Sequence, residues 1–350
     1  MKKIIIMFIV TVMLITLFGC GNSQTPAPEP SKVSQEPSES SPKVKILKAG
    51  IGLNDKHPQH IALLKFKEIV EEKTNGAIVI QTYHSGSLGD DRQMIQDLQL
   101  GSLDITIPAT APLANFAPEF NILNFPFLFQ NDKVADKVLD GQIGEEMLKK
   151  LPAAELVGLS YWEEGFYNIS NNVRPINSAG DLKGIKIRTM ENQILLDVFK
   201  ALGANPTPMA FGEVFTALQQ GVVDAQTNPL SQIYEAKFHE VQKYISKTND
   251  LYGVWVFLMS KATYDGLTPE QQEIVKEASI VARDYERKLT RDSENEYKEK
   301  LIAEGVQYND VAPEALTEMQ AIIQPVLDKY AAELEPDFVK RFFKAVKEAQ

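Results

Sequence analysis

The pattern of hydrophobic and polar positions alternates between strand-like and helix-like segments. Residues 44–53, "VKILKAGIGL", are mostly apolar and predict a strand, and residues 77–84, "AIVIQTYH", predict a second one. Between them, apolar residues of "QHIALLKFKEIVEEKTNG" recur every three or four positions, as in an amphipathic helix that stops at Gly76. Strand and helix alternating in this way predict an α/β fold with a largely parallel sheet.

A seven-residue pattern occurs twice. "LQLGSLD" at 98–104 is matched by "LQQGVVD" at 218–224. In both copies a helical stretch reaches a glycine, Gly101 or Gly221, that is suited to a left-handed helix stop, and a strand with an aspartate near its start follows. The repetition predicts two lobes built on similar units.

The C-terminal third has a helical pattern. Thr268 and Gln271 form a capping box, and Pro269 takes the first helical position. Apolar residues then recur at helical spacing with no helix breaker before Gly305. These features predict one helix of about 36 residues, roughly 55 Å long, which could run along two domains.

The N-terminus has the pattern of a targeting segment. Lys2 and Lys3 precede an apolar run at 4–18, which is short for a membrane span, so residues 1–19 are predicted to be a lipoprotein signal peptide. "LFGC" resembles a bacterial lipobox, which makes Cys20 the expected lipidation site; the alternative is a chance cysteine at a membrane anchor. Residues 20–43 are rich in Pro and Ser and predict a disordered tether. The location predicted is outside the cytoplasm, on the bacterial cell membrane.

Composition narrows the class of protein. The chain has 350 residues, 44% of them hydrophobic and 24% charged, which is enough for a two-lobed globular body. The net charge of −11 argues against non-specific electrostatic binding of nucleic acid. It does not exclude an anionic small molecule, since a single arginine acts locally. Because Cys20 is the only cysteine, an intramolecular disulfide and a cysteine-cluster metal site are both excluded.

Motifs for catalysis or cofactor binding are missing. The chain has no nucleophile elbow and no P-loop, and "GIG" at 50–52 is followed by Asp55 where a dinucleotide fingerprint needs glycine. His57 and His60 have Pro58 between them and no evident third ligand, so we expect no metal site and no cofactor. A metal pair stays as the weaker alternative to a solvated helix start.

Two pairs of adjacent carboxylates, Asp90-Asp91 and Glu163-Glu164, are candidates for acid–base catalysis. Asp90-Asp91 follows "GSLG" and more simply begins a helix, where acidic side chains favour the positive end of the dipole. Glu163-Glu164 has no catalytic partner in the sequence. A two-lobed body without a catalytic constellation indicates capture of a molecule rather than its conversion, so the protein is not expected to be an enzyme.

Several segments resemble one family. They are "LGDDRQMIQDLQLGSLDI" at 88–105, "NFPFLF" at 124–129, "SAGDLKGIKIRT" at 178–189, "ALGANPTPMAFGEVFTALQQGVVDAQTNP" at 201–229 and "KFHEVQKYISKTND" at 237–250. From about residue 45 onward the chain is similar to the solute-binding proteins of tripartite ATP-independent periplasmic (TRAP) transporters, of the C4-dicarboxylate-binding DctP type.

The resemblance implies a two-lobed, periplasmic-binding-protein-like α/β fold with a hinged cleft and a long helix spanning both lobes. Residues 45–165 plus 254–293 would form lobe I, and 166–253 plus 294–350 lobe II. It also implies a receptor that captures a small carboxylic acid and delivers it to a TRAP permease for uptake driven by an ion gradient. The protein is expected to be a monomer.

The resemblance also implies site residues. The arginine of the "KIR" motif, Arg188, would pair with the ligand carboxylate, and Asn228 and Phe211 would line the same site. Ligands of open α/β sheets lie beyond the carboxyl ends of strands, where Arg188 falls, and a guanidinium binds a carboxylate through two parallel hydrogen bonds. The alternatives are a surface charge for Arg188, a helix cap for Asn228 and a core position for Phe211.

Three further residues complete the predicted site. Asp91 matches a site-lining position of some relatives. Glu191 would either face the ligand or begin the following helix. Tyr167 stands where many relatives have a second arginine, in the pattern Gly-Phe-Arg, and it offers a neutral hydroxyl instead.

The missing second arginine bears on the identity of the ligand. It favours a monocarboxylate, such as a 2-hydroxy, 2-oxo or sugar acid, over a C4-dicarboxylate. The main alternative function is a ligand-sensing input module for a membrane signalling receptor, and a third is an extracellular hydrolase.

Overall fold

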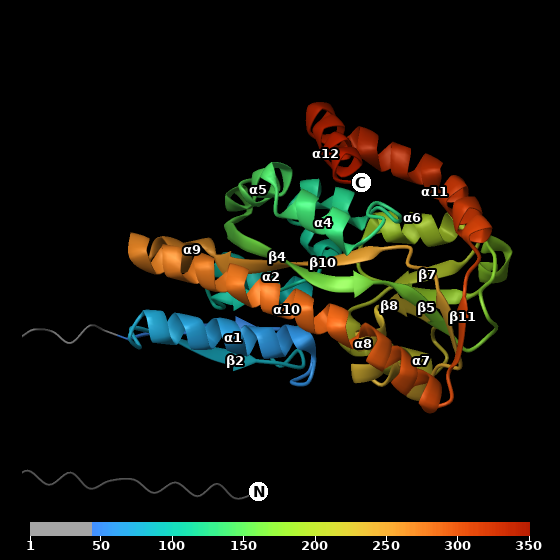
Figure 1. The fold of residues 1–350 in the computed structure, drawn as a ribbon, viewed down its shortest axis with the longest axis horizontal. Coiled ribbons are helices and arrows are strands. Elements are labelled where there is room, and N and C mark those ends of the chain that lie inside the picture. The colour runs from blue at the N-terminus through green and yellow to red at the C-terminus, as the bar shows by residue number, and fades with distance from the viewer. Residues whose placement is uncertain (1–43) are drawn as a thin grey trace, which may run out of the picture. The chain divides into compact units, whose positions relative to one another are not determined.

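The computed structural model describes residues 44–350. The predicted signal peptide, Cys20 and the tether lie outside this range. Two β-sheets form the frame of the described part, each with its own helices (Figure 1). We call the residues around them the first and the second lobe.

The first sheet has the strand order β2-β1-β3-β10-β4. Its strands are β1 (Lys45–Gly50), β2 (Ile78–Tyr83), β3 (Ile105–Thr106), β4 (Leu156–Phe166) and β10 (Tyr252–Ser260). The second sheet has the order β11-β9-β5-β8-β6-β7. Its strands are β5 (Asn168–Asn171), β6 (Lys186–Thr189), β7 (Asn205–Pro208), β8 (Ala225–Asn228), β9 (Tyr244–Lys247) and β11 (Gln307–Asp310). The predicted two-lobed α/β fold is confirmed.

The prediction of a largely parallel sheet holds only in part, because both sheets are mixed: five of their nine pairs of neighbouring strands are parallel. Strand β10 runs antiparallel to both β3 and β4, and β5 runs antiparallel to both β8 and β9. The reason is the way the chain crosses between the lobes. Strand β4 continues into β5 after Tyr167, and β9 returns into β10, so the two connections lie side by side in opposite directions. The Tyr167 amide donates a hydrogen bond to the Leu251 carbonyl at 2.8 Å across this crossing.

The helices cover both sheets. They are α1 (Pro58–Lys73), α2 (Asp91–Leu100), α3 (Thr110–Leu113), α4 (Asp132–Leu139), α5 (Gln142–Leu148), α6 (Gln193–Ala201), α7 (Val214–Gln219), α8 (Leu230–Glu235), α9 (Lys261–Asp265), α10 (Pro269–Ala303), α11 (Pro313–Glu333) and α12 (Pro336–Ala349). Within residues 44–350, none of them is both long and apolar enough to cross a membrane.

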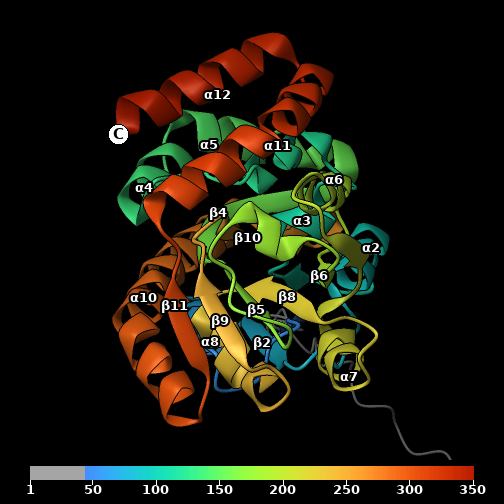
Figure 2. The same ribbon diagram turned by 90° about the vertical axis from the view of Figure 1, so that its right-hand side faces the viewer.

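The long C-terminal helix is present. Helix α10 has 35 residues, and its first turn carries the predicted capping box of Thr268 and Gln271. It packs against α1 and β4 of the first lobe and against α8 of the second, so it spans both, as predicted (Figure 1). Helix α11 packs against α6, and α12 against α4 and α5 (Figure 2). The lobe boundaries given above stay a prediction.

The repeated sequence pattern corresponds to a repeated structure. Gly101 and Gly221 both have left-handed backbone conformations, with φ of 72° and 68°. The Asp104 carboxylate accepts a hydrogen bond from the Lys48 amide at 2.8 Å, and the Asp224 carboxylate accepts one from the Lys186 amide at 3.1 Å. In each lobe, therefore, the aspartate after the glycine holds the strand that leads to the cleft.

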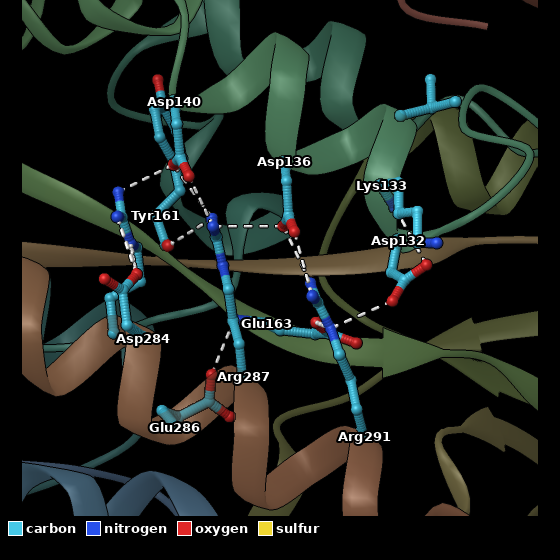
Figure 3. A network of polar contacts seen from close by, with 12 residues as sticks. Asp132, Lys133, Asp136, Asp140, Tyr161, Glu163, Asp284, Glu286, Arg287 and Arg291 are labelled. Atoms are coloured by element: carbon cyan, nitrogen blue, oxygen red, sulfur yellow. Dashed lines mark hydrogen bonds and ion pairs between the residues drawn. The ribbon is translucent and has the colours of Figure 1, made fainter.

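A partly buried ion network fastens α10 to α4 and β4 (Figure 3). The Arg287 guanidinium contacts Asp136 at 3.1 Å and Asp140 at 2.6 Å. Arg291 binds Asp136 at 2.8 Å and Glu163 at 2.6 Å. Because this network joins the spanning helix to β4, it fixes one side of the crossing between the lobes.

Glu286 lies fully buried beside this network. Its carboxylate accepts hydrogen bonds from the Thr290 hydroxyl at 2.7 Å and from the Glu163 amide at 3.0 Å. Burial raises the pKa of Glu286 from 4.5 to about 8. Since the folded state holds this proton more tightly than the unfolded chain does, the group stabilises the fold fully below about pH 4.5. That contribution is lost as the pH rises through about 8.

We therefore expect Glu286→Gln to reduce the pH dependence of stability. The parent should lose up to about 1.4 kcal/mol per pH unit from this group between about pH 5 and 8, and the amide, which does not ionise, should not. Thermal unfolding of both proteins over this range measures the difference. If the stability of the two proteins changed with pH in the same way, Glu286 would be ionised in the folded protein over this whole pH range.

Candidate functional site

A cavity of about 290 Å³ lies between the two lobes. It is lined by Gly52, Leu53, Gln59, Ser85, Gly86, Gly89, Asp90, Asp91, Ile107, Ala109, Pro112, Glu164, Arg188, Met190, Glu191, Met209, Ala210, Phe211, Gly212, Glu213, Asn228, Gln232 and Trp255. We call it the main cavity. Five of the six predicted ligand-binding residues line it: Arg188, Asn228, Phe211, Glu191 and Asp91.

Arg188 is held rigidly at the wall of the main cavity. It is the third residue of β6 and only 2% exposed, so the alternative of a surface charge is wrong. Its Nε and Nη2 atoms donate to the Met209 carbonyl at 3.0 and 2.8 Å, which leaves both Nη1 hydrogens and the second Nη2 hydrogen for a ligand. Burial lowers the pKa of Arg188 to about 10, so the guanidinium stays charged at neutral pH.

Asn228 lies on the neighbouring strand. Strands β6 and β8 are parallel partners, so their carboxyl ends, which carry Arg188 and Asn228, meet at one edge of the second sheet. Asn228 is 1% exposed, and its Nδ2 donates to the Gln226 side chain. Helix α8 begins only at Leu230 and has no side-chain cap, so Asn228 does not cap it.

Asp91 faces Arg188 from the first lobe. Asp90 caps helix α2, as expected for this pair, by accepting a hydrogen bond from the Gln93 amide at 2.8 Å. Asp91 accepts one from the Ala109 amide at 3.0 Å. Burial raises the pKa of Asp91 to about 6, although this hydrogen bond and the Arg188 charge oppose the rise.

Phe211 and Glu191 lie where the two lobes meet. Phe211 begins a short 3₁₀ turn (Phe211–Glu213) and packs on Phe238 with ring centroids 5.6 Å apart. The Glu191 carbonyl accepts a hydrogen bond from Asn115 of the other lobe at 2.9 Å. Helix α6 is capped by Asn192, so Glu191 does not begin it and its side chain stays at the cavity.

Tyr167 is not among the residues that line the main cavity. It is fully buried at the crossing of the lobes, behind Met190, whose sulfur lies 3.7 Å from the tyrosine hydroxyl. Its neighbours include Glu164, whose charge helps to raise the pKa of the phenol, after burial itself. The predicted contact of Tyr167 with a ligand stays a prediction.

Glu164 is the main site residue that sequence reasoning missed. It is 4% exposed, accepts a hydrogen bond from Gln232 at 2.9 Å, and has its pKa raised to about 7 by burial. Successive residues of a strand point to opposite faces, so Glu163 enters the ion network while Glu164 enters the main cavity. A Cβ at Gly253 would lie 2.7 Å from Glu164, so β10 makes room for this side chain.

Gln59 and Trp255 were also missed. Gln59 donates to the Ile107 carbonyl at 3.0 Å, and its Oε1 is buried with no partner in the described structure.

The sequence offered His57 and His60 as a possible metal pair, and no metal site was expected there. Among residues 44–350, no group of three or more His, Cys, Asp or Glu side chains is arranged to hold a metal ion.

Charge in the main cavity is unevenly distributed. Among the described residues that line it, Arg188 is the single cation, and the carboxylates are Asp90, Asp91, Glu164, Glu191 and Glu213. Three amide side chains, Gln59, Asn228 and Gln232, add donors and acceptors. Such a cavity suits a molecule with one anionic group and several hydroxyl groups.

Two lobes that enclose a polar cavity at their crossing define a solute-binding receptor. The sequence model of the bacterial extracellular solute-binding protein family 7, DctP, matches residues 49–334, and the chain belongs to this family. The predicted family is thus confirmed. The family is one of extracytoplasmic substrate receptors rather than enzymes.

The relatives agree in sequence and in structure. A solute-binding protein of Verminephrobacter eiseniae is 39% identical over 83% of this chain and 84% of its own. The 2,3-diketo-L-gulonate-binding periplasmic protein of Escherichia coli is 34% identical over 77% of this chain and 82% of its own. The crystal structure of the sugar acid binding protein of Advenella mimigardefordensis with galactonate has a TM-score of 0.86 and 39% identity, and the match covers 89% of this chain and 100% of that one.

Proposed function

We propose that this protein is an extracytoplasmic receptor for a sugar acid, a monocarboxylate with several hydroxyl groups, and that it delivers this acid to a TRAP permease. The observation that carries the proposal is the charge of the main cavity, where one buried arginine stands among five carboxylates. Arg188 binds the carboxylate of the ligand. The carboxylates and amides around it bind the hydroxyl groups.

A dicarboxylate fits this cavity poorly. Its second carboxylate would be placed among acidic side chains, and Arg188 is the single cation among the described residues that line the main cavity. Like charges at short distance cost energy in a partly buried site. Hydroxyl groups have the opposite property, because each one donates a hydrogen bond to a carboxylate or amide oxygen. The number of acceptors in the main cavity therefore favours a polyhydroxylated ligand.

Protonation of the acidic side chains adds to this fit. The pKa values of Asp91, about 6, and Glu164, about 7, lie close to neutral pH. Each group therefore changes between a donor and an acceptor at little cost. This lets the pair adapt to a hydroxyl group that either donates or accepts.

Size and the relatives support the same class of ligand. A volume of about 290 Å³ leaves room for a small sugar acid. The structure with 39% identity described above is a complex with galactonate. A solute-binding protein of a Polaromonas species, 37% identical to this chain, has a structure with bound D-erythronate.

The N-terminal segment fits a receptor held at the membrane. We propose that Cys20 is lipidated and that the 20–43 segment tethers the folded part to the cell membrane as a monomer. Replacement of Cys20 by serine should move the protein from the membrane fraction to the soluble fraction. A variant that stays in the membrane fraction would point to the uncleaved apolar run as the anchor.

A thermal-shift screen tests the ligand class. We expect galactonate, D-gluconate, D-erythronate or D-glucuronate to raise the midpoint of unfolding, since a ligand at 100 times its Kd stabilises by about 2.7 kcal/mol. Succinate and malate should have no comparable effect at the same concentration. Stabilisation by the dicarboxylates and by none of the sugar acids would reject the proposal.

A further inference from the structure

A second cavity adjoins the main one. Its volume is about 240 Å³, and it is lined by Gly52, Leu53, Asn54, His57, Ser85, Phe211, Gly212, Phe215, Gln232, Glu235, Ala236 and Phe238. We call it the second cavity. It shares with the main cavity Gly52, Leu53, Ser85, Phe211, Gly212 and Gln232. A ligand held at Arg188 can therefore extend past Phe211 into it.

Two glycines lie where the main cavity and the second cavity adjoin. Gly52 and Gly212 line both cavities. A Cβ at Gly212 would have no atom within 4 Å, and one at Gly52 would approach only Asp91, at 3.6 Å. Neither glycine has a positive φ, so what their lack of a side chain provides here is open space.

The chemistry of the second cavity differs from that of the main one. Of the described residues that line it, none is Lys or Arg, so a second carboxylate would have no counterion there. Three aromatic residues, Phe211, Phe215 and Phe238, form much of its wall. Aromatic rings pack well against the apolar C–H face of a pyranose ring. These properties suit the uncharged sugar ring of a longer ligand.

His57 contributes an uncharged ring to this wall. Its Nδ1 accepts a hydrogen bond from the Gln59 amide at 3.1 Å, so the neutral ring carries its proton on Nε2. The side chain is 1% exposed, and Nε2 has no partner within residues 44–350. Nε2 is itself buried, so His57 contributes a neutral ring to the wall and no contact with the space of the second cavity. Burial lowers the pKa of His57 to about 3, so the ring stays neutral at physiological pH.

Both lobes contribute to the second cavity, as they do to the main one. Asn54 precedes α1, and its Nδ2 donates to the Glu235 carbonyl at the end of α8, at 2.9 Å. Both residues line the second cavity. Whatever occupies it is therefore held when the lobes close, together with the group at Arg188.

We propose that the second cavity binds the neutral end of an extended sugar acid, a disaccharide acid whose carboxylate is held by Arg188. The inference rests on the proposed function, because it assumes that the acid end occupies the main cavity. The second sugar ring packs against Phe211, Phe215 and Phe238.

Binding of four extended acids, each compared with its shorter counterpart, tests the inference. The extended probes are lactobionate, cellobionate and maltobionate, which are gluconate with a hexose on O4, and phenyl β-D-glucuronide. The short probes are D-gluconate and D-glucuronate, measured beside galactonate and D-erythronate. We expect at least one extended acid to raise the midpoint of unfolding of the parent protein.

Two matched variants locate the extension. Ala236 lines only the second cavity and Ala210 only the main one, and both are half-buried. Ala236→Phe should fill the second cavity and weaken binding of the extended acid about tenfold or more, with affinity for the short acids unchanged. Ala210→Phe should weaken both kinds of acid.

The possible outcomes separate the two proposals. If none of the short and extended acids binds, the proposed function itself fails, and the inference fails with it. If short acids bind but no extended acid does, only the inference is overturned. It is also overturned if an extended acid binds Ala236→Phe as tightly as it binds the parent.

Discussion

Replacement of Arg188 by alanine should weaken binding of the sugar acid by about two to three orders of magnitude. Removing one partner of a buried ion pair costs about 3–5 kcal/mol, and each 1.4 kcal/mol is about a factor of ten in affinity. The cost is high here because the ligand carboxylate would then face only the carboxylates and amides of the main cavity. Titration calorimetry with the acid that stabilises the parent most measures the effect.

Two control variants accompany this substitution: one keeps the charge at position 188, and the other removes a nearby exposed arginine. Arg188→Lys keeps a positive charge but loses the paired hydrogen bonds, so its affinity should fall between those of the parent and the alanine variant. Arg92 is exposed at the rim of the cleft, 3.9 Å from Glu191, and Arg92→Ala should change the affinity only a few-fold, as exposed pairs contribute little. An Arg188→Ala protein that binds as tightly as the parent would rule out the proposed carboxylate contact.

The sequence was enough to predict those site residues whose positions follow from the start of a helix or the end of a strand. Helix α2 begins at Asp91, as the Asp90-Asp91 pattern indicates. Arg188 and Asn228 stand near the ends of strands that pair in parallel, so a rule about strand ends was enough to place them together. The repeated glycine and aspartate also have the same roles in both lobes, as expected from their spacing.

The order of the strands could not be predicted in the same way. Strand β10 is nine residues long, and its sequence, "YGVWVFLMS", shows that it is buried without showing which strands flank it. Its position between β3 and β4 results from the return of the chain from the second lobe, which is a long-range property. For this reason the sheets are mixed where the alternation of helix and strand predicted parallel ones.

The role of Glu164 could not be predicted either, because it depends on contacts with elements far away in the sequence. In "SYWEEGFY" the two glutamates could be assigned to opposite faces of a strand from the alternation alone. What each face meets depends on α4, α8 and α10, which follow or precede it by many residues. Gln59, from the start of α1, likewise reaches the main cavity only because the first lobe folds around it.

Replacement of Arg287 by methionine should destabilise the protein by about 3 kcal/mol. Arg287 is 6% exposed, and it binds Asp136 and Asp140 of α4 and also the Tyr161 carbonyl at 3.0 Å (Figure 3). Methionine fills a similar space but removes the cation that the two aspartates share, while Asp136 keeps Arg291 at 2.8 Å and Asp140 keeps Arg283 at 2.9 Å. We expect the low end of the usual 3–5 kcal/mol because each aspartate side chain is about a quarter exposed, at 27% and 28%.

The adjacent residue of α10 provides a matched control. Lys288 pairs with Asp292 on the solvent side of the helix, where its side chain is 70% exposed. Lys288→Met should therefore cost less than about 1 kcal/mol, as surface ion pairs usually do. Urea unfolding at low ionic strength, followed by both fluorescence and circular dichroism, measures the two variants, and coincident transitions justify a two-state treatment. Equal stabilities of the two variants would mean that the network is not what fastens α10 to the first lobe.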